Sequence, residues 1–196
     1  MIGEFLLSFI PLFVAIDVLG NMPSLVSLTS GMTPKQRQSV INESVSVACL
    51  LVVFFILVGK WILRTIGIAI PDFKIAAGLL LLVISAGLLL SGEGKFADSN
   101  NEKSSVGILP LATPMITAPT VLIIALILAD DTGIPMTLVA VVLNMLIVWL
   151  VFLNSQRIFR FIGRAGSRTF SRMCDILLAA IAVMLIRQGI TQIFFL

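Results

Sequence analysis

Two short stretches combine polar side chains with helix-breaking residues inside apolar runs, and their residue types suit binding chemistry. They read Asp17-Val18-Leu19-Gly20-Asn21-Met22-Pro23 and, 96 positions later, Thr113-Pro114-Met115-Ile116-Thr117-Ala118-Pro119. Each begins with a polar residue, has another four positions on, and ends in proline. Proline lacks a backbone donor and clashes with the carbonyl four residues before it, so we expect a helix break before each closing proline.

A break inside a membrane has two interpretations. A single proline kink is usually structural, because proline and glycine are common in membrane helices. Non-helical backbone at that depth persists, however, only where protein buries it or where it lines an aqueous cavity. A matched pair of breaks in the two halves of a chain is the pattern typical of a transporter's central binding site. We therefore interpret the pair as functional.

The two breaks together suit a small zwitterion. A broken helix has free carbonyls and a negative dipole end before the break, and free amides with a positive end after it. Asp17, at a carbonyl end, could hold a substrate ammonium, a sodium ion or a proton, and an intramembrane acid is a functional hypothesis by default. The alternative is a structural ion pair with Arg187. We expect a substrate carboxylate to meet the backbone donors that follow each break, those of Ser24, Leu25, Thr120 and Val121.

The predicted substrate-binding residues lie either at one of the two breaks or at the middle of an expected span. Asn144, in the fifth expected span, has an interhelical hydrogen bond as its alternative role. The full set is Asp17, Gly20, Asn21, Pro23, Ser24, Thr113, Pro114, Thr117, Ala118, Pro119, Thr120 and Asn144.

Composition excludes a soluble domain and most site chemistries. Hydrophobic residues make up 59% of the chain and charged residues 12%, with a mean hydropathy of +1.14, which indicates a polytopic membrane protein. The net charge is +3, and the basic residues lie mainly in short connections between the apolar runs and not on one face. We therefore expect no nucleic-acid partner. With no histidine and two separate cysteines, the sequence predicts no metal site, no catalytic residue and no cofactor beyond a coupling ion, Na⁺ or H⁺.

Six apolar runs are long enough to cross a bilayer, which takes about 20 residues: 5–28, 39–63, 73–90, 106–129, 134–155 and 173–193. Before the second run, Thr33-Pro34-Lys35-Gln36 predicts a helix start with a capping box. The polar linker 92–105 divides a single transmembrane domain into repeat one, residues 1–91, and repeat two, residues 106–196. Three crossings precede the linker, so the second half is inverted. The prediction is an all-α membrane protein of two inverted three-helix repeats with broken first and fourth helices.

Basic residues predict the orientation. The connections after the first, third and fifth runs hold Lys35, Arg37, Lys95, Lys103, Arg157, Arg160, Arg164, Arg168 and Arg172, whereas the opposite side holds Lys60, Arg64 and Lys74. Cytoplasmic connections are enriched in Lys and Arg. We therefore expect those three connections in the cytoplasm and both termini on the outer side of a bacterial or archaeal plasma (inner) membrane.

Several motifs together resemble the MarC family of prokaryotic inner-membrane proteins. They are D-V-L-G-N-M-P at 17–23, G-I-A-I-P-D-F-K-I-A-A-G at 67–78, L-P-L-A-T-P-M-I-T-A-P-T at 109–120, and the closing segment 171–190. The resemblance implies a six-span inverted-repeat protein of the wider LysE-like carrier group, some members of which are described as transporters of small neutral amino acids. Four residues depart from the family pattern: Val18, Ala118, Asp175 and Met184.

The sequence and the resemblance together predict a secondary transporter of small neutral amino acids such as glycine and alanine, working by alternating access around the paired breaks. The alternative is a channel or a non-transporting regulatory membrane protein whose breaks are only structural. A membrane enzyme is the weakest hypothesis, because the sequence has no evident nucleophile–base pair or metal cluster. The coupling ion, the direction of transport and a homo-oligomeric state stay open.

Overall fold

The computed structural model of the chain describes residues 2–91 and 119–194. Over these ranges the chain forms seven helices and no strand: α1 (Ile2–Ile16), α2 (Met22–Leu28), α3 (Pro34–Ile66), α4 (Ile70–Ser91), α6 (Pro119–Asp131), α7 (Ile134–Leu153) and α8 (Ser155–Phe194). The predicted all-α class is therefore confirmed for the described residues. Four of these helices, α3, α4, α7 and α8, are long and apolar enough to cross a membrane. That the chain crosses the membrane six times stays a prediction.

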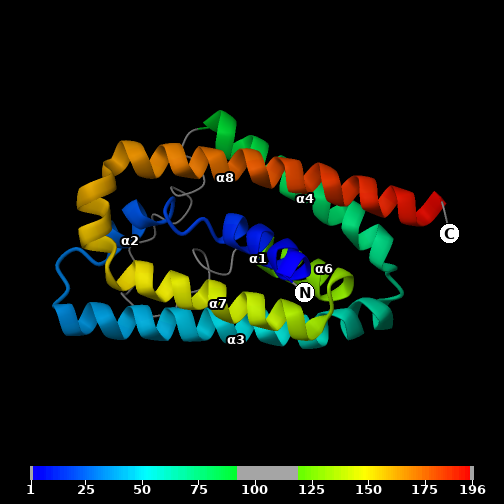
Figure 1. The fold of residues 1–196 in the computed structure, drawn as a ribbon, viewed down its shortest axis with the longest axis horizontal. Coiled ribbons are helices and arrows are strands. Elements are labelled where there is room, and N and C mark those ends of the chain that lie inside the picture. Colours follow the sequence, from blue (N-terminus) through cyan, green and yellow to red (C-terminus); the bar gives the residue numbers. More distant parts are fainter. Residues whose placement is uncertain (1, 92–118, 195–196) are drawn as a thin grey trace.

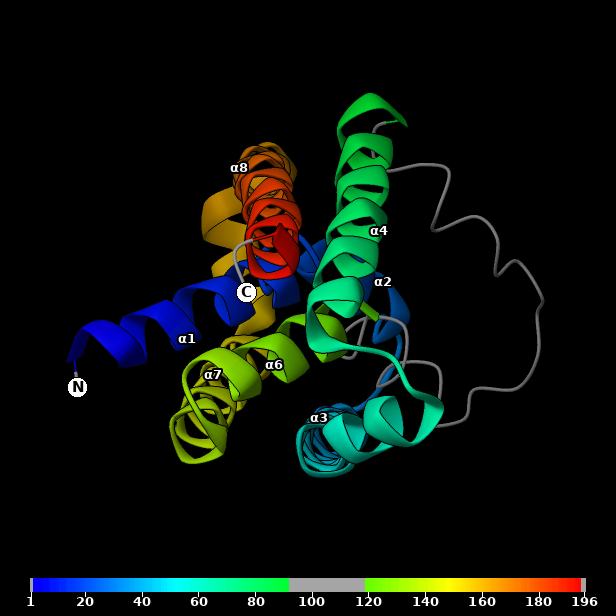
Figure 2. The same cartoon turned by 90° about the vertical axis from the view of Figure 1, so that its right-hand side faces the viewer.

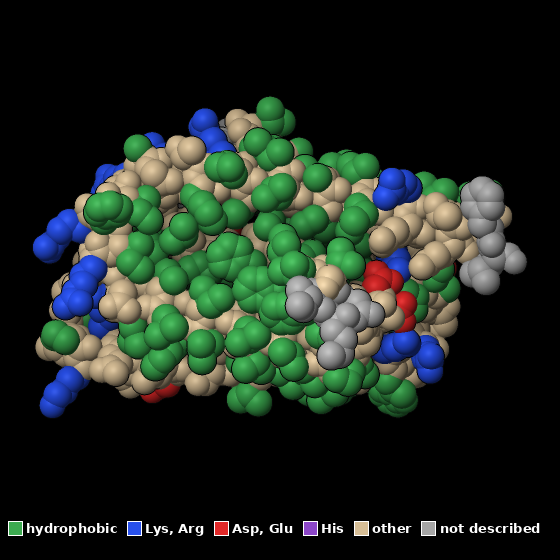
Figure 3. All heavy atoms as spheres, in the orientation of Figure 1, with side chains coloured by type: hydrophobic (Ala, Val, Ile, Leu, Met, Phe, Trp, Pro, Cys, Tyr) green, Lys and Arg blue, Asp and Glu red, His purple; other side chains and the backbone are tan. Residues whose placement is uncertain are grey.

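The helices form three layers (Figures 1 and 2). Antiparallel α3 and α7 make one outer layer, antiparallel α4 and α8 make the other, and α1 and α6 lie between them. The connections at residues 29–33 and at residue 154 lie at one end of the bundle, at the left in Figure 1, while 67–69 and 132–133 lie at the other. Lys and Arg side chains gather at that left end, whereas the right end carries both basic and acidic side chains (Figure 3).

The start of α3 follows the predicted capping box. The amide of Gln36 donates to Thr33 Oγ1 at 3.3 Å, and the amide of Thr33 donates to Gln36 Oε1 at 3.0 Å. These two bonds satisfy donors that the first turn of a helix leaves free. At its other end α3 stops at Gly67, which has a left-handed φ of 84° that favours glycine.

Two glycines let α4 and α8 approach closely. A Cβ on Gly78 would lie 2.7 Å from the carbonyl oxygen of Ala182, and a Cβ on Gly189 would lie 2.7 Å from that of Pro71. In both cases an isoleucine three positions before the opposite glycine supplies a further contact, at 2.6 Å. Gly78 thus contacts Ala182, which is seven positions before Gly189, and Gly189 contacts Pro71, which is seven positions before Gly78. The contact between the two helices is therefore locally two-fold symmetric. Gly78 and Gly189 are therefore small residues that allow close helix packing.

The basic connection expected between residues 155 and 173 is helical, which corrects the sequence interpretation. It forms the first part of α8, bent at Gly163 (φ 69°, ψ 177°), so that the segment before the bend runs across the end of the bundle (Figure 1). Arg37 is also not a solvated loop residue. It is buried, and its Nη2 donates to Ser155 Oγ and to the carbonyl of Phe152. The guanidinium therefore joins the start of α3 to the α7–α8 junction.

Candidate functional site

The chain leaves the helical conformation at the first predicted break. α1 ends at Ile16, residues 17–21 form turns, and α2 begins at Met22. Asp17 has a φ of 43°, and among the described residues no other non-glycine has a positive φ. Aspartate tolerates this left-handed region better than most residues. Pro23 lies in the first turn of α2, where its missing donor costs nothing.

Asn21 satisfies a carbonyl that the break sets free. Its Nδ2 donates to the carbonyl of Ile16 at 2.8 Å, in place of the amide that a continuous helix would have supplied. Its own carbonyl accepts from the amide of Leu25 at 3.1 Å. The expectation that the Leu25 donor points into the gap is therefore wrong, because α2 uses that donor for its first turn.

The carboxylate of Asp17 is held by donors from two elements. Ser171 Oγ on α8 donates to Oδ2 at 2.5 Å, and the amide of Gly20 donates to Oδ1 at 3.2 Å. The side chain of Cys174, one turn along α8, lies close to this carboxylate. A Cβ on Gly20 would lie only 1.9 Å from Asp17 Oδ2. Glycine at position 20 is thus what allows the carboxylate to fold back over the turn.

The alternative in which Asp17 pairs with Arg187 is wrong. Arg187 is exposed, and it follows Ser171 by sixteen positions on α8, which corresponds to about 24 Å along the helix axis. The acid meets the middle of α8, at Ser171, and the arginine lies closer to the C-terminal end of that helix.

One polar face of α8 covers the break, and sequence reasoning missed it. Ser167 is buried, and its Oγ donates to the carbonyl of Leu19 at 2.5 Å. Ser171 follows at i+4 and the buried Asp175 at i+8. A polar repeat with a spacing of four inside an apolar helix was the signal available in the sequence. Asp175 had been noted only as a departure from the family pattern.

Asn144 makes the interhelical hydrogen bond that was its alternative role. It is buried, and its Nδ2 donates to the carbonyl of Ala140 on its own helix at 2.9 Å and to that of Phe9 on α1 at 3.3 Å. Its Oδ1 is buried with no hydrogen-bond partner within the described residues. Phe9 precedes the end of α1 by seven residues, about 10 Å along the axis, so the structure does not bring Asn144 to the break.

The remaining predicted residues divide between the two halves. Ser24, in the first turn of α2, is exposed. Pro119 is the first residue of α6 and is exposed, and Thr120 next to it is buried. The other four residues of the second break, Thr113, Pro114, Thr117 and Ala118, lie outside the described residues.

A groove lies elsewhere on the surface, between α3 and α7. It has a volume of about 410 Å³ and is lined by residues that include Ser46, Cys49 and Met145. At one side Trp149 Nε1 donates to Asn42 Oδ1 at 2.7 Å. The groove contains none of the predicted site residues, so it is separate from the break.

Comparison with known proteins agrees with the apolar helical architecture. A family model described as MarC family integral membrane protein matches residues 2–194. The chain belongs to the MarC family of integral membrane proteins. It is 33% identical over 195 residues to a UPF0056 membrane protein of Methanocaldococcus jannaschii, with 95% of each chain covered. It is 30% identical to a UPF0056 membrane protein of Archaeoglobus fulgidus, covering 96% of this chain and 92% of the relative.

A bacterial MarC relative carries a location in its name. The UPF0056 inner membrane protein YhgN of Escherichia coli is 24% identical to this chain, with 96% of each covered. No solved structure matches the chain. The family resemblance found in the sequence motifs is confirmed, and the chain is an integral membrane protein.

Proposed function

We propose that this MarC protein is a secondary transporter that moves small neutral amino acids, of the glycine and alanine type, across the plasma (inner) membrane by alternating access. The observation that carries the proposal is the break at residues 17–21 in an apolar helix, where a carboxylate faces the polar side of α8. A charge at the centre of a membrane helix costs about 2.5–3.5 kcal/mol on insertion scales. An acid at this depth is therefore a candidate for binding a substrate or an ion.

Asp17 is the group we propose for the substrate ammonium or for the coupling ion, Na⁺ or H⁺. Two of its donors, the Ser171 hydroxyl and the Gly20 amide, are neutral. Hydrogen bonds between two charged groups are shorter and stronger than those with neutral donors. An arriving ammonium can therefore replace the Ser171 hydroxyl at the carboxylate, which gives a reason for α8 to move when substrate binds.

The second half of the proposed site comes from the second break. Pro119 is the first residue of α6, and Pro23 lies in the first turn of α2; in the proposal residues 113–118 supply the matching polar groups. The two-fold contact between α4 and α8 supports an inverted repeat, because it relates the third helix of one half to the last helix of the other. In this arrangement both termini lie outside, and the protein falls in the LysE-like carrier group.

Uptake of labelled alanine or glycine into proteoliposomes, with and without a Na⁺ or proton gradient, tests the proposal. Saturable uptake that unlabelled substrate competes with supports a carrier, and linear flux indicates a channel. Asp17→Asn keeps a hydrogen-bond acceptor for Ser171 but removes the charge. We expect it to insert and fold like the parent and to lose accumulation against a gradient. Glu43→Gln, at an exposed acid on α3, is the matched control and should accumulate normally.

Two results would contradict this assignment. Full accumulation by Asp17→Asn would mean that the acid takes no part in binding or coupling. Absence of saturable uptake by the parent, under each gradient and with both amino acids, would favour a non-transporting regulatory protein whose break is only structural.

A further inference from the structure

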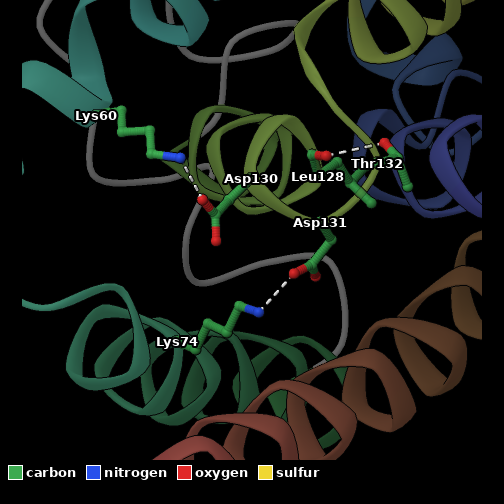
Figure 4. A network of polar contacts seen from close by, with 6 residues as sticks. All are labelled: Lys60, Lys74, Leu128, Asp130, Asp131 and Thr132. Atoms are coloured by element: carbon green, nitrogen blue, oxygen red, sulfur yellow. Dashed lines mark hydrogen bonds and ion pairs between the residues drawn. The ribbon is translucent and has the colours of Figure 1, made fainter.

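A second polar cluster lies at the end of the bundle opposite the basic end, where α6 stops. α6 ends in two adjacent acids. Lys60 Nζ on α3 lies 2.6 Å from Asp130 Oδ1, and Lys74 Nζ on α4 lies 2.6 Å from Asp131 Oδ1 (Figure 4). One helix end is therefore tied by ion pairs to two helices from different layers of the fold.

The two ion pairs differ in their access to water. The side chain of Lys74 is 1% exposed and that of Asp131 is 31% exposed, whereas the Lys60–Asp130 pair is 39% and 23% exposed. Removing one partner of a buried ion pair is strongly destabilising, because it leaves an uncompensated charge inside the protein. Lys74 is the buried member of its pair, and Asp131 is the member that water can reach.

These acids do not serve α6 itself. The C-terminal end of a helix carries a partial negative charge, so two carboxylates in its last turn are unfavourable for the helix alone. The lysines of α3 and α4 offset that cost. The physical value of the acids therefore lies in the contacts they make across the bundle.

Hydroxyl groups extend the cluster to two further helices. Thr132 follows the acids, and its Oγ1 lies 2.7 Å from Ser8 Oγ on α1 and 3.3 Å from Thr137 Oγ1 on α7. Both partner side chains are fully buried. Residues 130–132 thus hold α1, α3, α4 and α7 together through groups that can exchange their hydrogen bonds for water.

We propose that residues 130–132 and their partners form a gate that closes this end of the substrate pathway, and that the Lys74–Asp131 pair must separate when the gate opens. The proposal rests on the alternating-access function above, which requires contacts at each end that break and re-form. The structure then represents the state in which this end is closed. Lys74 is a positioning residue, because its role is exerted through Asp131 and α6.

Water access below the gate provides a test that needs no substrate. In a protein with Cys49→Ser and Cys174→Ala, the reporter is Ala77→Cys, a buried position one turn beyond Lys74 on α4. The measurement is the rate at which a membrane-impermeant maleimide labels this cysteine in proteoliposomes. We expect Asp131→Asn to raise that rate at least about tenfold, because Lys74 then lacks its carboxylate and draws water into the gap.

Two variants control the labelling experiment. Asp131→Glu keeps the charge and should label as slowly as the parent. Asp130→Asn removes the partner of the more exposed Lys60, which stays hydrated, so its effect should be several-fold smaller than that of Asp131→Asn. Equal labelling of the parent and Asp131→Asn, in protein that remains monodisperse, would overturn the gate.

A second measurement does not depend on the folding of Asp131→Asn. Lys74→Cys with Asp131→Cys, joined by a short bifunctional thiol reagent that reduction removes, should stop uptake until a reductant is added. Uptake that continues through the cross-link would overturn the gate. If the parent takes up neither amino acid but Asp131→Asn still labels faster, the gate holds and the amino-acid proposal fails.

Discussion

Gly20→Ala is the change whose effect the structure defines most sharply. The new Cβ would lie 1.9 Å from Asp17 Oδ2 and 2.6 Å from Ser171 Oγ, far inside van der Waals contact, so the carboxylate must leave its position. The bond from Ser171 to Asp17 is then lost, which costs about 1.5–3 kcal/mol for a hydrogen bond to an ionised group. Overpacking adds about 1–3 kcal/mol. We expect the free energy of unfolding to fall by about 3 kcal/mol or more.

Reversible unfolding in mixed micelles measures this change. Gly3→Ala is the matched control, because it makes the same substitution in α1, where the added Cβ would meet nothing within 4 Å. It should be neutral or slightly stabilising, since alanine is the better helix former by about 1 kcal/mol.

A double-mutant cycle tests the cause of the effect. In an Asp17→Ala background the clashing carboxylate is absent, so Gly20→Ala should cost much less than in the parent. Such non-additivity is the expected result for residues in contact. An equal cost in both backgrounds would refute the reasoning, because the penalty would then come from the backbone at position 20 or from the contact with Ser171 Oγ, and not from the folded-back acid.

Three further predictions concern packing, capping and orientation. Gly78→Ala and Gly189→Ala should destabilise the protein by similar amounts, about 1–3 kcal/mol each in micelle unfolding, because the two glycines meet the opposite helix at matching distances; a large difference would contradict the symmetric contact. Thr33→Ala removes the cap of α3 and should cost about 0.5–2 kcal/mol, while Thr33→Ser should restore most of it. A reporter active only in the cytoplasm should work when fused after Arg164 and fail after Leu196, and the reverse would overturn the orientation drawn from the basic connections.

The amino-acid sequence by itself determined the features that depend on neighbours a few positions away. The capping box at Thr33 and Gln36, the end of α3 at Gly67 and the place of the first break follow from local backbone chemistry. The membrane class followed from composition, and the family followed from its motifs. None of these signals depends on a contact between residues that are distant in the sequence.

Only the tertiary structure decided which residues meet across the bundle. The carboxylate of Asp17 accepts a hydrogen bond from Ser171, which is 154 positions away, and the predicted Arg187 is not in reach. Lys74 and Arg37 were counted as residues of membrane-flanking connections, yet both are buried in specific contacts. Sequence reasoning assigned each of them by its distance from an apolar run, which does not report the direction in which a side chain points.

The physical reason is the nature of membrane helices. In a soluble helix the apolar stripe indicates which face is buried, but lipid is as apolar as a protein core, so a helix that is hydrophobic all round does not show which face meets its neighbours. Helix rotation and register then depend on close-packed small residues and on a few polar contacts. The meeting of Gly78 with Ala182, and of Ser167 with the carbonyl of Leu19, exists only once the helices are assembled.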